Sequence, residues 1–463
     1  MFADQLAQHG QRTALILESG DAVSYQDLAA GADAVFDRPD APNLPHVPIA
    51  IECVNALSTL QAYLGALRRH IPALLMDATL HADMRSRLYQ RFQIEHVWTA
   101  DGAWQRTGMG PHQPAAHPDL ALLLSTSGST GEPKLVKLTA ANLQANAASI
   151  VSYLGITHDE RPITTLPVHY SYGLSVINSH LLAGATILLT DKSIASAPFW
   201  PFFKAHGATS LSGVPATYAI LRKLRFERMS LPSLRTLTQA GGAMPLDDVR
   251  WYAEQAQAKG LKLVVMYGQT EATARMAYIP PDRLTDKMGA IGIAIPGGQL
   301  HLVNEQGEIV NQPREQGELR YTGPNVMMGY ACDVADLALP DQQHQVLRTG
   351  DLGWQDEDGY LYITGRLKRF IKVFGNRIGL DEVESHLKQS GFDVAVTGRD
   401  DLLVVACREA GADTPPDTAA LSTLLVNRYR LHPTAIKVAL IDAFPLSSSG
   451  KVQYQELLKL TAA

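Results

Sequence analysis

The chain of 463 residues contains little cysteine and no long apolar run. Its three cysteines, Cys53, Cys332 and Cys407, are too few and too scattered for a disulfide framework, and no Cys/His spacing suggests a zinc site. No uninterrupted apolar stretch approaches the ~18 residues that a membrane span needs. The first residues, 1–5, lack the basic start and apolar stretch of a signal peptide. We therefore expect a cytoplasmic protein with no membrane span.

The chain also lacks a strong excess of charge, because its formal net charge is only −6. This balance gives no reason to expect nucleic acid or an anionic membrane as a partner. A local exception is a basic cluster, which is either a solvated face or a surface that faces phosphate. The cluster consists of Arg366, Lys368, Arg369, Lys372 and Arg377.

Short apolar segments alternate with longer amphipathic ones as far as Gly292, which predicts parallel sheets covered by helices on both faces. After Gly292 short alternating runs rich in Gly and Pro predict a small antiparallel, barrel-like portion. From Gly365 onward the pattern predicts a compact α+β unit. The expected strands are 47–51, 121–124, 185–189, 234–237, 261–266, 370–373, 402–407 and 435–441, and the expected helices are 56–69, 143–153, 215–224, 381–389 and 417–429.

The stretch 125–134 reads Ser-Thr-Ser-Gly-Ser-Thr-Gly-Glu-Pro-Lys and follows the buried strand expected at 121–124. Glycines let backbone N–H groups approach an anion, hydroxyl groups donate further hydrogen bonds, and the lysine adds a positive charge. The stretch is not a Walker P-loop, because Gly131 is followed by Glu132 rather than by lysine. It is either a loop that holds a polyphosphate or a Ser/Gly linker.

Four further motifs follow in order: Tyr-Gly-Gln-Thr-Glu at 267–271, Arg-Thr-Gly-Asp at 348–351, Gly-Arg-Leu-Lys at 365–368 and Ser-Gly-Lys at 449–451. With the loop at 125–134 they resemble the AMP-forming adenylating enzymes, which include acyl- and aryl-CoA synthetases, adenylation domains of nonribosomal peptide synthetases, and luciferase. The resemblance extends from about Leu122 to Leu457.

The resemblance implies an ATP-dependent acid–thiol ligase. A carboxylate attacks the α-phosphorus of ATP to give acyl-AMP and pyrophosphate, and the acyl group then passes to CoA or to the phosphopantetheine arm of a carrier protein. The implied fold is α/β: a large N-terminal domain, residues 1–365, with two doubly wound sheets and the barrel-like portion, and a small mobile α+β domain, residues 366–463.

The resemblance also assigns roles to single residues. Lys451, Lys134, Thr126 and Lys372 are the implied catalytic residues, and Lys368 is the implied hinge. Asp351 would bind the ribose hydroxyls, and Arg366 the ribose or phosphate. The remaining nucleotide-binding residues are Ser127, Gly128, Ser129, Thr130, Gly131, Gly241, Gly242, Ala243, Tyr267, Gly268 and Thr270.

Glu271 is a carboxylate beside a phosphate loop, where a bare negative charge would repel ATP. Magnesium typically takes one or two carboxylates together with phosphate oxygens. Glu271 is therefore either a magnesium ligand or a charge that favours the N-terminus of a helix.

The segment 166–175 corresponds to the entrance of the acid pocket, with His169 and Tyr170 as candidate pocket residues. Amino-acid-activating relatives place an aspartate in this segment to pair with the substrate's α-ammonium, and here that position is Gly173. A buried ammonium without a partner is costly. We therefore expect a small aryl or a short-to-medium acyl acid without an α-amino group.

Several residues depart from the family pattern. The segment 377–384 is closer to carrier-loading domains than to CoA ligases, which leaves open a stand-alone amino-acid adenylating enzyme that loads a carrier protein. Leu135, where the family usually has Gly, and Ala140, where it commonly has His, leave open a nucleotide-binding relative that has lost catalysis.

Overall fold

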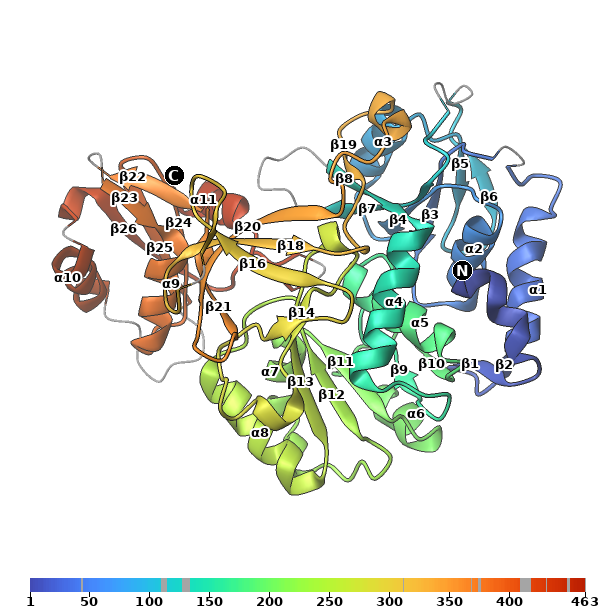
Figure 1. Ribbon diagram of the computed structural model, residues 1–463, viewed down its shortest axis with the longest axis horizontal. Helices are drawn as coiled ribbons and strands as arrows, with labels where there is room; N and C mark the ends of the chain where they lie inside the picture. The colour runs from blue at the N-terminus through green and yellow to red at the C-terminus, as the bar shows by residue number, and fades with distance from the viewer. Residues whose placement is uncertain are drawn as a thin grey trace. The chain divides into compact units, whose positions relative to one another are not determined.

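The computed structural model of the chain describes residues 1–463 except 43–44, 110–114, 127–133, 311, 368, 374–375, 409–417, 430, 448–449 and 463, and it leaves the side chains of 126, 376, 377 and 462 undescribed (Figure 1). Two compact units are present. The first comprises Met1–Leu300 with Tyr321–Leu347, and the second comprises His301–Arg320 with Arg348–Ala463. The domain boundary expected at residue 365 stays a prediction.

The first unit contains a nine-stranded sheet in the order β15-β14-β13-β12-β11-β9-β10-β1-β2. Its central strands, from β13 to β1, are parallel to their neighbours, and β2, β14 and β15 pair antiparallel at the edges. The bounds are β1 (Thr13–Leu17), β2 (Ala22–Ser24), β9 (Pro162–Ile163), β10 (Ile187–Leu189), β11 (Ser210–Gly213), β12 (Thr236–Gln239), β13 (Lys262–Tyr267), β14 (Ala277–Tyr278) and β15 (Ile293–Ala294).

A seven-stranded sheet in the order β19-β8-β7-β4-β3-β5-β6 completes the sheets of the first unit. Strands β7, β4, β3 and β5 are parallel, whereas β8 pairs antiparallel with β7 and with β19. The bounds are β3 (Ile49–Cys53), β4 (Ala73–Asp77), β5 (His96–Trp98), β6 (Trp104–Arg106), β7 (Leu120–Thr126), β8 (Lys134–Thr139) and β19 (Gly329–Ala331).

Helices α4 and α5 link the two sheets, because α4 contacts β7, β8 and α5, and α5 contacts β10 (Figure 1). Helix α4 begins with a capping box between Thr139 and Asn142 and ends at Gly155, whose left-handed backbone stops the helix. The described α-helices of this unit are α1 (Tyr25–Phe36), α2 (Leu57–Arg68), α3 (Ala82–Arg91), α4 (Ala140–Leu154), α5 (Ser171–Leu182), α6 (Phe199–Ala205), α7 (Pro215–Lys223) and α8 (Leu246–Lys259).

The second unit holds most of a five-stranded sheet in the order β17-β16-β18-β20-β21, followed by the α+β portion. Buried Leu, Val and Ile side chains of α9, α10, β22, β24 and β25 form the core of that portion. The bounds are β16 (Gln299–Val303), β17 (Ile309–Val310), β18 (Gly317–Thr322), β20 (Val346–Gln355), β21 (Leu361–Arg366), β22 (Phe370–Val373), β23 (Asn376–Gly379), β24 (Val394–Arg399), β25 (Leu402–Arg408), β26 (Ile436–Ile441), α9 (Leu380–Gln389), α10 (Thr418–Tyr429) and α11 (Tyr454–Ala462).

The expected α/β class is confirmed, with antiparallel strands after Gly292 and an α+β portion at the end of the chain. Among the residues that the structure describes, no helix combines the length and apolar character required to cross a bilayer.

Candidate functional site

Three neighbouring parallel strands of the first unit end at the same edge of the nine-stranded sheet. Strand β11 ends before Val214, β12 before Gly241–Ala243, and β13 at Tyr267. Ligands of open α/β sheets bind outside the carboxyl ends of such strands. The predicted adenine-binding residues therefore lie at the edge where a nucleotide site is expected.

The turn after β12 lies against the predicted acid pocket. The buried Gln239 amide donates a 2.8 Å hydrogen bond to the Gly242 carbonyl, which fixes the turn. A Cβ atom at Gly241 would lie 2.5 Å from the Tyr170 hydroxyl oxygen. Tyr170 therefore packs directly on the predicted nucleotide-binding turn, and the structure brings these two sets of residues together.

The segment that follows β13 joins the same cluster. Gly268 passes close to the backbone carbonyl of Ala274, which leaves no room for a side chain. The hydroxyl oxygens of Thr270 and Ser171 lie 3.1 Å apart, so this segment contacts the start of α5. The motif at 267–271 and the acid-pocket segment thus form one continuous surface.

Glu271 has a partner that the sequence did not reveal. The Tyr330 hydroxyl donates a 2.7 Å hydrogen bond to its carboxylate, and the Lys134 ammonium lies 5.8 Å from the centre of the Tyr330 ring. Burial, followed by the Glu271 charge, raises the pKa of Tyr330, so its hydroxyl stays protonated and donates. Because Tyr330 reaches this place through the pairing of β19 with β8, no local sequence signal identifies it.

His169 and Gly173 occupy confined positions. The His169 Nε2 atom lies 3.7 Å from the Asp77 carboxylate, yet burial lowers the pKa of His169 despite this charge. A Cβ atom at position 173 would lie 2.3 Å from the Pro167 carbonyl oxygen and 3.0 Å from that of Leu166. The backbone at Gly173 therefore excludes any side chain, including an aspartate.

In the second unit, Asp351 on β20 and Arg366 on β21 are register partners. The Arg366 Nε atom lies 3.0 Å from the Asp351 carboxylate. The Asp351 side chain is only 4% exposed, whereas that of Arg366 is 62% exposed. The guanidinium therefore remains accessible while it holds the carboxylate.

Lys372 and Lys451 both have exposed side chains, and hydrogen bonds fix the backbone at each residue. The Lys372 N–H donates to the Asp400 carboxylate at 2.9 Å. The Ser447 N–H donates to the Lys451 carbonyl at 2.8 Å, and Leu446 and Val452 form an isolated antiparallel β-bridge. Ser127, Gly128, Ser129, Thr130, Gly131, Lys368 and the side chain of Thr126 lie outside the described residues.

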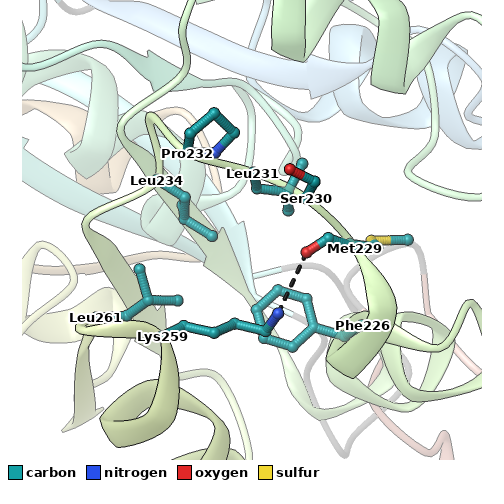
Figure 2. A pocket seen from close by; sticks show the side chains of 8 residues that line it. All are labelled: Phe226, Met229, Ser230, Leu231, Pro232, Leu234, Lys259 and Leu261. Carbon is teal, nitrogen blue, oxygen red and sulfur yellow. Dashed lines mark hydrogen bonds between the residues drawn. The ribbon is translucent and has the colours of Figure 1, made fainter.

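A cavity of about 220 Å³ in the first unit is unrelated to these motifs (Figure 2). It is lined by residues such as Leu234 and Leu261, which precede β12 and β13, so it lies at the opposite ends of those strands. Figure 2 shows the Lys259 ammonium turned toward the Met229 carbonyl, to which it donates at 3.2 Å. The Glu227 carbonyl accepts a second bond at 3.0 Å, so this lysine has a structural role.

Comparison with known proteins identifies the family. The family model "AMP-binding enzyme" matches residues 64–331. Indoleacetate–CoA ligase of Aromatoleum aromaticum is 32% identical over 76% of this chain and 69% of its own length. Oxalate–CoA ligase of Arabidopsis thaliana is 30% identical over 73% of this chain and 67% of its own length.

The fold agrees with this assignment. The structure of O-succinylbenzoate CoA synthetase (MenE) from Bacillus subtilis in complex with AMP superposes with a TM-score of 0.81 at 24% identity, over 98% of this chain and 97% of that one. ATP-bound MatB from Rhodopseudomonas palustris gives a TM-score of 0.78 at 23% identity, over 99% of both chains. This chain belongs to the family of AMP-binding enzymes and is an ATP-dependent, AMP-forming ligase.

Proposed function

We propose that this AMP-forming acid–thiol ligase activates a carboxylic acid that has no α-amino group and transfers the acyl group to CoA. The observation that carries the choice of acid is the backbone at Gly173, where a Cβ atom would lie 2.3 Å from the Pro167 carbonyl oxygen. No carboxylate can reach the pocket from this position to pair with an α-ammonium. The acceptor is supported by the relatives, whose names describe them as CoA ligases.

The chemistry brings two anions together, so positive charge has to be in place where negative charge develops. In our proposal Lys134 and the loop at 127–131 hold the β- and γ-phosphates of ATP, and Tyr267 with Gly241–Ala243 encloses the adenine. Asp351 binds the ribose, and Lys451 stabilises the α-phosphate during adenylation. Lys372 acts in the thioester step, and Lys368 is the hinge.

Glu271 suits a magnesium ion that is bound mainly by the phosphates of ATP. Within the described ranges no three His, Cys, Asp or Glu residues are grouped as a metal cage would require. A single carboxylate oriented by Tyr330 fits an ion that takes its other ligands from phosphate and water. Such an ion would neutralise phosphate charge, and Glu271 would position it.

A panel of carboxylic acids tests the proposal, with acid-dependent exchange of pyrophosphate into ATP as the readout. CoA and a phosphopantetheinylated carrier protein are then offered in parallel, and thioester is measured. We expect exchange with acids that lack an α-amino group, and product with CoA. Conversion of ATP to ADP and phosphate with every acid would refute the proposal.

The sequence from Arg377 to Glu384 favours a second candidate, an amino-acid adenylating enzyme that loads a carrier protein. Exchange stimulated by one amino acid and not by its deaminated analogue would support this candidate. Acylation of the carrier without acylation of CoA would identify the acceptor.

A further inference from the structure

Arg275 lies close to the predicted acid pocket, and its side chain is among the largest fully buried ones of the described residues. It follows the motif at 267–271 and is only 2% exposed. Its guanidinium carbon lies 3.8 Å from the centre of the Tyr172 ring, and its Nε lies 3.4 Å from the Met266 sulfur. The residue therefore lies between α5 and β13, beside the surface shared by the acid-pocket segment and the nucleotide motif.

The described residues that contact this guanidinium do so through neutral groups. These groups are the Tyr172 ring, the Met266 sulfur and the hydroxyl of Tyr153. Burial raises the pKa of Tyr153, Tyr170 and Tyr172, and the Arg275 charge offsets part of each rise, which leaves these hydroxyls protonated at neutral pH. Among the described carboxylates none forms an ion pair with Arg275.

A buried guanidinium without a counter-charge is costly, since burying an ion carries a penalty of several kcal/mol. A cation–π contact recovers about 2 kcal/mol when it is desolvated, but the Tyr172 ring carries no negative charge to balance the guanidinium. The planar guanidinium matches a carboxylate with two parallel hydrogen bonds. The missing partner of Arg275 is therefore best supplied by a ligand.

We propose that Arg275 binds a second carboxylate on the acid substrate, so that the enzyme activates a dicarboxylic acid. The inference rests on the proposed function, because it concerns the acid that occupies that site. One carboxylate reacts with ATP, and the other forms paired hydrogen bonds with the Arg275 guanidinium. Tyr172 and Tyr153 surround the bound carboxylate end and exclude water from it.

The test uses the purified full chain and pairs of acids that differ only in the second carboxylate, such as glutarate with pentanoate and terephthalate with benzoate. We expect kcat/KM for pyrophosphate exchange to favour the dicarboxylate by about 10²-fold or more. In Arg275→Met, kcat/KM for the dicarboxylate should fall by about 10²-fold, while that for the monocarboxylate changes little.

The Tm of Arg275→Met shows whether a loss of activity toward the dicarboxylate comes from misfolding. Methionine fills a similar volume without a charge, and replacing a buried ion in this way is often neutral or stabilising, so the Tm of Arg275→Met should not fall. The matched control is Arg222→Met, because Arg222 also lies over an aromatic ring, that of Trp251 at 5.0 Å, but has Asp248 as its partner. This control should keep the wild-type preference between the two acids.

Ligand binding gives a second readout that does not depend on catalysis. The dicarboxylate should raise the Tm of the wild-type protein more than the monocarboxylate does, and this difference should vanish in Arg275→Met. Equal use of both acids by the wild type, or an unchanged ratio in the variant, would overturn the inference and leave the proposed function standing. Absence of exchange together with a Tm shift that only the dicarboxylate causes would refute the proposed function and support the binding of a dicarboxylate by Arg275.

Discussion

At the scale of the residue, the hydrogen bond between Tyr330 and Glu271 leads to a graded prediction. Glu271→Gln should raise the Mg²⁺ concentration needed for half-maximal exchange by about 10-fold, because the carboxylate ligand is lost. Tyr330→Phe should raise it by roughly 5-fold, the effect of one ordinary hydrogen bond of about 1 kcal/mol. The measurement is a Mg²⁺ titration at fixed ATP.

The control for this series is Tyr89→Phe, which removes a similar Tyr–Glu hydrogen bond, to Glu52 at 3.3 Å, away from the motifs. It should leave the Mg²⁺ dependence as it is in the wild type. An unchanged dependence in Glu271→Gln would argue that this carboxylate does not bind the ion.

Some of the candidate site residues could be predicted from the sequence, and others could not. The strands that precede Tyr267 and Gly241 are visible in the sequence, whereas the roles predicted for these two residues come from the resemblance. Tyr330 and Arg275 could not be predicted, since their importance comes from partners brought together by strand pairing and helix packing. A buried arginine carries no mark in the sequence that distinguishes it from an exposed one.

At the scale of the element, helix α5 contains a buried histidine that makes stability depend on pH. His180 Nδ1 bonds the Val176 carbonyl at 2.7 Å, and burial lowers the pKa of His180 to about 4. The unfolded chain takes up this proton near pH 6.5, so stability is lost as pH falls from about 6.5 to about 4. Between pH 7 and pH 5 this one group should remove about 2 kcal/mol.

Urea unfolding of wild type and His180→Leu at both pH values checks this expectation. The loss of stability between pH 7 and pH 5 should be about 2 kcal/mol smaller in the variant. The exposed His158, changed to Gln, serves as the control and should behave like the wild type. Equal losses in His180→Leu and wild type would show that this histidine does not set the acid sensitivity.

Elements with strong local patterns were predicted closely. The helix expected at 215–224 is α7 (Pro215–Lys223), and the strand expected at 370–373 is β22. The strand expected at 234–237 is displaced, because Leu234 is buried but precedes the ladder of β12. Short strands such as β14 and β19 escaped prediction because they are too short to show alternation, and their pairing defines them.

At the scale of the whole molecule, Glu384 connects four segments of the second unit. Its carboxylate accepts from Arg369 at 2.9 Å, Lys388 at 2.6 Å, Tyr454 at 3.0 Å and the Val396 N–H at 2.9 Å. Its side chain is only 9% exposed, although it is charged. Glu384→Gln should therefore destabilise this unit by about 2 kcal/mol, since the charged hydrogen bonds to Glu384 are weakened and Arg369 keeps only Asp381 as a counter-charge.

Hydrogen exchange of the α9 and β24 amides measures this loss within the second unit alone. Glu382→Gln is the matched control, because it makes the same change at an exposed position of α9 and should alter stability by at most about 0.5 kcal/mol. Exchange that is equally slow in Glu384→Gln and Glu382→Gln would contradict the structural role of the network.

Because the proposed reaction has two steps, a substitution in the second unit should be able to slow one step and spare the other. Lys451→Ala should slow adenylate formation by about 10²–10³-fold, as loss of one charge-stabilising donor typically does, and should largely spare thioester formation from supplied acyl-AMP. Each step is assayed alone, with Lys459→Ala as the control for removing an exposed lysine. Equal loss of both steps would contradict the assignment of Lys451 to adenylation.

The crowded backbone at Gly173 also limits how this enzyme can be redesigned. An engineer who wished to install amino-acid selectivity would begin with Gly173→Asp, yet the new side chain would collide with the Pro167 carbonyl at its first atom. A single codon change is thus expected to yield misfolded protein rather than a new specificity. The whole junction between β9 and α5 would have to be exchanged, because the carbonyls that crowd Gly173 belong to that junction.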